Sequence, residues 1–141
     1  MAHVSLLNLQ GNHIGDPGVL ALAPLLRNLP RLEALYIDFN GITEDGALPR
    51  LGHLSLGANL LGDDGMRALA AAIAGGGLAR LELLHLGNND IGDAGAKALA
   101  AACVSADTLP RLEELFLDDN EIGDAGMRAL AAAIAGGGWQ G

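Results

Sequence analysis

The chain has 141 residues, half of them apolar and only 3% aromatic, and 17 Asp and Glu outnumber 8 Lys and Arg, for a net charge of −9. This length predicts a single domain over residues 1–141. Nucleic-acid binding needs clustered Lys and Arg, which the sequence lacks, so we expect no nucleic-acid partner and favour a basic protein partner instead.

Cysteine usage and hydropathy argue against a disulfide-stabilised protein and against a membrane-spanning protein. Cys103 is the single cysteine, so no disulfide framework exists, and we expect this side chain to be a small buried hydrophobe. The uncharged run between Arg67 and Arg80 is shorter than the roughly 20 apolar residues that a membrane span needs. No secretory signal opens the sequence. We therefore expect a cytoplasmic protein with no membrane partner.

A nine-residue pattern, L-x-x-L-x-L-x-x-N, occurs five times with small variations. The copies begin at Val4, Leu32, Leu51, Leu81 and Leu112, and they end at Asn12, Asn40, Asn59, Asn89 and Asn120. Each copy predicts a short strand whose L-x-L side chains face inward. The amide of each asparagine is expected to bond the turn backbone of neighbouring coils. Because such a short unit cannot bury its own apolar face, the units must stack.

The copies divide the chain into repeats at about 4–31, 32–50, 51–80, 81–111 and 112–141. Four repeats have room for a helix, and Asp16, Asp63, Asp93 and Asp124 are predicted to be the N-caps of these helices. Glycine triplets at 75–77 and 136–138 are predicted to end two of them. The second repeat is too short: Leu-Pro-Arg-Leu51 follows almost directly after Gly46, so we expect this repeat to lack its helix.

Two segments of the chain are nearly identical. Residues 62–77 and 123–138 differ at one of 16 positions, Asp64 against Ala125. Either a recent internal duplication or a regularised design accounts for this. Neither end carries the polar cap that a solenoid needs, so we expect a fragment of a longer array, with possible self-association through its ends.

The motifs resemble the leucine-rich repeat family, and within it the ribonuclease-inhibitor-like subclass. The residues that carry the resemblance are the five strand motifs together with Ile14-Gly-Asp-Pro-Gly18, Leu61-Gly-Asp-Asp-Gly65, Ile91-Gly-Asp-Ala-Gly95 and Ile122-Gly-Asp-Ala-Gly126. The resemblance implies an α/β solenoid, a horseshoe arc with five parallel strands on the concave side and helices on the convex side. That family includes inhibitors, GTPase activators and immune sensors, so it does not specify one function.

Functional residues are expected on the concave sheet, where alternate strand residues point outward. Large aromatic side chains on a polar sheet suit interface hot spots, and carboxylates beside them suit a basic partner. The candidate partner-binding residues are Tyr36, Asp38, His53, His85, Glu114, Phe116, Asp118 and Asp119. His53 and His85 lie on neighbouring strands but are offset by two residues, and no third ligand is near, so we expect no metal site.

No motif for a nucleophile, a zinc helix or a phosphate loop is present, so we expect no enzyme activity and no cofactor. The preferred hypothesis is a protein-interaction module that binds on its concave face. The alternatives are a fragment of a regulator similar to the Ran GTPase activator, and a structural or designed repeat with no dedicated partner. No residue of the activator family can be matched here, so no catalytic role is carried over.

Overall fold

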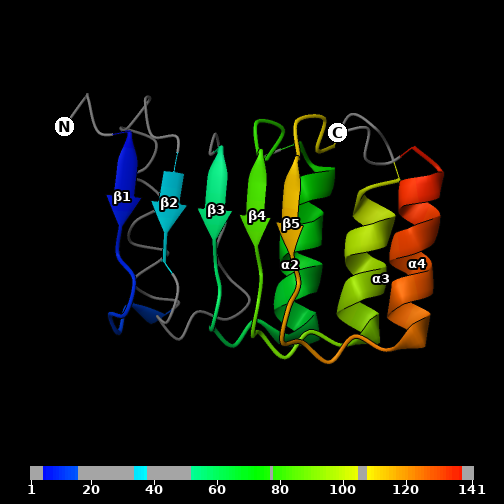
Figure 1. The fold of residues 1–141 in the computed structure, drawn as a ribbon, viewed down its shortest axis with the longest axis horizontal. Coiled ribbons are helices and arrows are strands. Elements are labelled where there is room, and N and C mark those ends of the chain that lie inside the picture. The colour runs from blue at the N-terminus through cyan, green and yellow to red at the C-terminus, as the bar shows by residue number, and fades with distance from the viewer. Residues whose placement is uncertain (1–4, 16–33, 38–51, 77, 105–107, 138–141) are drawn as a thin grey trace.

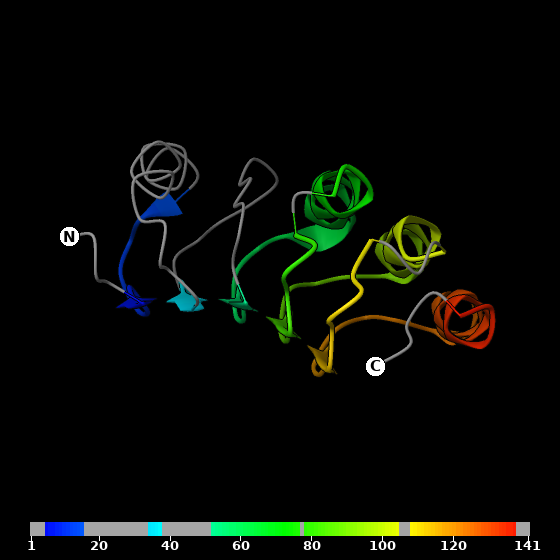
Figure 2. The ribbon, with the colours of Figure 1, turned by 90° about the horizontal axis from the view of Figure 1, so that it is seen from above.

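The computed structural model describes residues 5–15, 34–37, 52–76, 78–104 and 108–137. Within these ranges the chain forms an arc in which strands line the inner side and helices line the outer side (Figures 1 and 2). No helix among these residues is long and apolar enough to cross a membrane.

Five short strands form one parallel sheet in chain order, as the repeated motif predicts. They are β1 (Leu6–Asn8), β2 (Ala34–Tyr36), β3 (His53–Ser55), β4 (Leu83–His85) and β5 (Glu114–Phe116). Equivalent motif positions stand side by side in every pair, so Leu35 aligns with Leu54 and Leu84 aligns with Leu115. β4 and β5 run parallel to the strand before them because the chain returns to the sheet through α2 and α3 on the outer side.

Three helices are described, one in each of the last three repeats: α2 (Gly62–Ala74), α3 (Asp93–Ala102) and α4 (Asp124–Ala135). Their Ala- and Leu-rich sequences are strong helix formers. Gly76 and Gly137 follow the ends of α2 and α4 with φ of 77° and 82°, a conformation that glycine adopts at no steric cost. The predicted helix of the first repeat and the predicted loss of a helix in the second lie outside the described residues.

The core is a thin layer between sheet and helices, built from the inward side chains of each repeat. Leu35, Leu54 and Leu84, at the strand centres, are at most 1% exposed. From the helix side, Met66, Ile73 and Cys103 are 0% exposed, so Cys103 is the buried hydrophobe that was predicted.

Asparagine side chains join successive coils, as predicted. The buried amide of Asn89 donates to the carbonyl of Leu56 in the preceding repeat at 2.9 Å and to Leu86 in its own repeat at 3.1 Å. Asn59 and Asn120 bond in the same way, to Ile37 and to Leu86. Asn12 bonds carbonyls of its own repeat, and Asn40 lies outside the described residues.

The predicted helix caps are wrong for Asp63 and Asp93, because each caps the helix of the following repeat and not its own. Asp124 makes no side-chain cap with α4, and Asp16 lies outside the described residues. The backbone N–H groups of Gly92 and Gly95, at the start of α3, both donate to Asp63 Oδ1 at 2.8 Å. Asp93 accepts the same pair of bonds from Gly123 and Gly126 at the start of α4.

The reason for this difference lies in the local backbone. An N-cap residue is extended, and Gly92 and Gly123 already occupy that position with ψ of −164°. Asp93 and Asp124 are therefore inside the first turn. A carboxylate there cannot turn back onto its own amides, whereas the N-terminus of the stacked neighbour is within reach.

Candidate functional site

The inner face of the sheet carries the outward side chains of the five strands. Along its central row the strand register aligns Ser55 with His85 and His85 with Phe116. Tyr36, His53 and His85 are half-buried, and Glu114, Phe116, Asp118 and Asp119 are exposed. Seven of the eight predicted site residues therefore lie among the described residues and retain accessible surface. Asp38 lies outside them.

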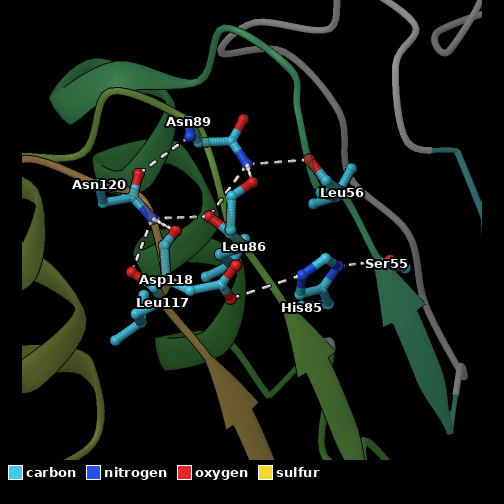
Figure 3. A network of polar contacts seen from close by, with 9 residues as sticks. Ser55, Leu56, His85, Leu86, Asn89, Leu117, Asp118 and Asn120 are labelled. Atoms are coloured by element: carbon cyan, nitrogen blue, oxygen red, sulfur yellow. Dashed lines mark hydrogen bonds and ion pairs between the residues drawn. The ribbon is translucent and has the colours of Figure 1, made fainter.

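His85 is the centre of a connected group on this face, called here the His85 cluster, with Ser55, Phe116 and Asp118. Figure 3 shows the His85 ring between Ser55 and Asp118. Its Nδ1 lies 3.0 Å from Ser55 Oγ, within hydrogen-bond distance, and its Nε2 lies 3.7 Å from Asp118 Oδ1. The Phe116 ring meets the imidazole edge to face, with ring centres 5.6 Å apart and an angle of 82°. Contacts on three sides hold the imidazole in one orientation.

Gly87 makes room for this cluster. A Cβ at Gly87 would lie 2.8 Å from both carboxylate oxygens of Asp118 and 2.9 Å from His85 Nε2. A side chain at this position would therefore push the two residues apart. The φ of Gly87 is not positive, so its backbone conformation does not require a glycine. Glycine is needed here because it leaves space for Asp118 and His85.

The second histidine of the face belongs to a separate contact. His53 Nε2 lies 3.8 Å from Glu82 Oε2, and both side chains are more than 40% exposed. His53 aligns with Leu83 across the strands, one row away from His85. The diagonal offset predicted from the sequence is confirmed. Within the described ranges, no group of three or more His, Cys, Asp or Glu side chains is arranged to hold a metal ion.

Ser55, His85 and Asp118 are the residue types of a catalytic triad, in which a histidine and a carboxylate activate a serine nucleophile. Ser55 is only 5% exposed. A nucleophile must reach the reacting carbon of a substrate. The buried hydroxyl cannot, and its contact serves to orient the imidazole. The cluster therefore presents the imidazole of His85, the phenyl ring of Phe116 and the carboxylate of Asp118 to a molecule that approaches the sheet.

The candidate set predicted from the sequence left out three residues of this face: Ser55, Gly87 and Glu82. Ser55 and Gly87 could have been found from the strand register, because they neighbour His85 and Asp118 in adjacent positions. Glu82 precedes the strand motif, and only the packing of successive coils brings it to His53.

The outer side carries a shallow apolar groove between α3 and α4, with a volume of about 330 Å³. Five of its eight lining residues are alanines, and the others are Lys97, Val104 and Gly136. Val104 is 66% exposed. The groove lacks the convergent polar groups that usually orient a small ligand, so the inner face remains the better candidate.

Comparison with known proteins agrees with this architecture. A family model described as Leucine Rich repeat matches residues 1–23, 81–100 and 109–131, a little under half of the chain. These stretches carry the first, fourth and fifth copies of the strand motif. The fold is a leucine-rich-repeat solenoid. The ribonuclease-inhibitor-like subclass stays a prediction.

Among solved structures, the solenoid is similar to the crystal structure of an internalin from Listeria monocytogenes. The two are 24% identical with a TM-score of 0.43, and the match covers 77% of this chain and 35% of the internalin chain. The chain thus spans about a third of the length of that protein. A comparison with curated proteins gives no match.

Proposed function

We propose that this leucine-rich-repeat solenoid is a protein-interaction module that binds its partner on the inner face of the sheet. The observation that carries the proposal is the His85 cluster. Phe116 is 42% exposed on that face and is braced by an imidazole that is itself held by Ser55 and Asp118. A braced aromatic ring loses little rotamer entropy on binding, which is the property of an interface hot spot.

Charge supports a basic partner. Five carboxylates, Glu82, Glu113, Glu114, Asp118 and Asp119, are exposed along β4, β5 and the turns beside them. The whole chain has a net charge of −9. Complementary charge accelerates encounter and rejects acidic partners more than it raises affinity. The preferred ligand is a segment that offers an apolar or aromatic side chain to Phe116 and Lys or Arg to the carboxylates.

Selection of peptides from a random library displayed on phage tests this function without a known partner. We expect enriched peptides to combine basic and aromatic residues. Their affinity for the Phe116→Ala and Tyr36→Ala variants should fall about 30-fold, because removal of a hot-spot side chain typically costs about 2 kcal/mol. Arg67→Ala is the control, because Arg67 is exposed on α2, on the outer side. Affinity is measured by calorimetry.

Equal and negligible losses for all three variants would contradict inner-face binding, as would selected peptides that are predominantly acidic. The GTPase-activator alternative has its own readout. It requires that the chain accelerate GTP hydrolysis by a small GTPase, and we expect no acceleration.

A further inference from the structure

Three outward side chains follow one another along β5 and the turn after it: Glu114, Phe116 and Asp118. All three are exposed, whereas the two leucines between them are half-buried and pack against the core. Alternate residues of an extended chain point to the same face, about 7 Å apart. The pairing between coils continues past the end of the strand, because the N–H of Asn88 donates to the carbonyl of Asp118 at 2.9 Å. The Phe116 ring therefore has a carboxylate on either side of it along the chain.

The two carboxylates of this row are open to a cation from outside. Within the described part of the chain, no Lys or Arg side chain forms an ion pair with Glu114 or Asp118. Asp118 faces the imidazole of His85, with 3.7 Å between its Oδ1 and Nε2 (Figure 3), and its side chain is still 60% exposed. A cationic group of a partner therefore meets two accessible carboxylates.

The aromatic ring between the carboxylates distinguishes one basic side chain from the other. A guanidinium is planar and weakly hydrated, so it stacks on an aromatic face within about 6 Å of the ring centre while its N–H groups bond a carboxylate. The ammonium group of lysine is a compact, strongly hydrated charge that gains less from such a ring. Phe116 is 42% exposed, and its edge-to-face contact with His85 holds the ring in place. Ring and carboxylates together favour arginine over lysine.

We propose that an arginine of the partner binds on this row, with its guanidinium on the Phe116 ring and its N–H groups directed at the carboxylates of Glu114 and Asp118. This inference rests on the proposed function, binding on the inner face, and names the basic residue that the face selects. The arginine lies beside the apolar side chain of the partner that contacts the same ring.

Titration of the full chain at pH 7.5 with two capped tripeptides, acetyl-Gly-Arg-Gly-amide and acetyl-Gly-Lys-Gly-amide, tests this choice of residue. Binding is followed by NMR through the shifts of the backbone amides. We expect the arginine tripeptide to shift the amides of β5. Its affinity should be roughly threefold higher than that of the lysine tripeptide, which is the difference that a solvent-exposed cation–π contact makes.

Variants separate the ring from the charges. Phe116→Leu keeps an apolar side chain without a π face, so it should reduce the affinity for the arginine tripeptide to that for the lysine tripeptide. Glu114→Gln, which leaves the His85 cluster intact, should weaken both tripeptides by a similar factor. The matched control is Asp64→Asn, which removes the same charge from an exposed residue of α2 on the outer side and should change neither affinity. The amide spectrum of each free variant verifies its fold.

Equal affinities for the two tripeptides, an arginine preference that survives Phe116→Leu, or shifts that do not involve β5 would overturn the inference. Failure of the proposed function is recognised separately, through the peptide selection. Selected peptides that lose affinity with Phe116→Ala but tolerate replacement of every arginine by lysine support inner-face binding and overturn the choice of arginine. An arginine tripeptide that binds this row, in a chain that selects no inner-face peptide, supports the arginine contact and contradicts the proposed function.

Discussion

Single asparagines hold the coils of this protein together by satisfying carbonyl groups that the turns leave open. Asn89 is fully buried, and its amide donates to Leu56, Leu86 and Gly87. Its side-chain oxygen faces the N–H of Leu61 at 3.4 Å. A buried polar group without a partner costs about 1–3 kcal/mol, so one side chain here prevents several such losses. Among the described residues, the same residue type at Asn12, on the exposed first coil, bonds carbonyls of its own repeat.

Replacement of Asn89 by alanine should therefore be among the most destabilising single changes. We expect Asn89→Ala to lower the free energy of unfolding by about 3 kcal/mol, because the carbonyls of two repeats lose their donor. Asn12→Ala, the control, should cost under about 1 kcal/mol, since water can reach the exposed turn. Urea denaturation followed by circular dichroism measures both. Similar losses for the two variants would mean that the contact between repeats contributes nothing beyond the local turn.

At the scale of elements, the starts of α3 and α4 each depend on the repeat before them. The N–H groups at the start of α3 and α4 are satisfied by aspartates of the preceding repeats. The glycine at the fifth position of Ile-Gly-Asp-x-Gly makes the approach possible: a Cβ at Gly95 would lie 2.7 Å from Asp63 Oδ1, and one at Gly126 would lie 2.7 Å from Asp93 Oδ1. Capping thus couples neighbouring repeats and adds to the interface energy on which solenoid stability depends.

Three equivalent aspartates should consequently differ in their effect on stability. Asp63→Ala and Asp93→Ala each remove a cap and should cost about 1–2 kcal/mol. Asp124→Ala removes a carboxylate that caps no helix within the described part of the chain, so it should cost under about 1 kcal/mol, the contribution of a first-turn acid. Denaturation at low protein concentration, where self-association is absent, measures the three values. If each aspartate capped its own helix, all three substitutions would have equal effects.

At the scale of the whole molecule, stability is a sum over repeats and the contacts between neighbours. Full burial is concentrated in the middle of the array, where Leu54, Leu84 and Leu86 are at most 1% exposed. The strand-centre leucines of both edges, Leu7 and Leu115, are half-buried. The short second repeat is expected to be the weak unit, because it has too few residues for a helix between Asn40 and Leu51.

A helix inserted into the second repeat should stabilise the molecule. Placing a copy of residues 66–77 after Gly46 should raise Tm by several degrees, since about 1 kcal/mol corresponds to roughly 3–5 °C in a domain of this size. Native-state hydrogen exchange should show the earliest opening near residues 36–56 of the unmodified chain. The strongest protection in that region, together with a lower Tm after the insertion, would show that the short repeat is already a well-packed unit.

Much of the fold could be predicted from the sequence because its signals are local and repeated. The strand positions, their parallel order, the asparagine bonds and the glycine ends of the helices follow from residue type and spacing, and the structure confirms each of them within the residues it describes. Of the candidate site, the register placed His85 and Phe116 in one row. The register also aligned Ser55 with His85, whereas tertiary packing decided that Asp118 would approach the imidazole and that Glu82 would reach His53.

The two nearly identical helices mark the boundary between what the sequence determines and what only the tertiary structure decides. Residues 62–77 and 123–138 differ at one of 16 positions, so the sequence by itself assigns the same amphipathic helix to both. Met66 is nevertheless 0% exposed and Met127 is 53% exposed. Asp63 caps a neighbour and Asp124 is left exposed. Local sequence sets the conformation of a repeat, but burial and capping depend on the coil stacked beside it, about 30 residues further along the chain.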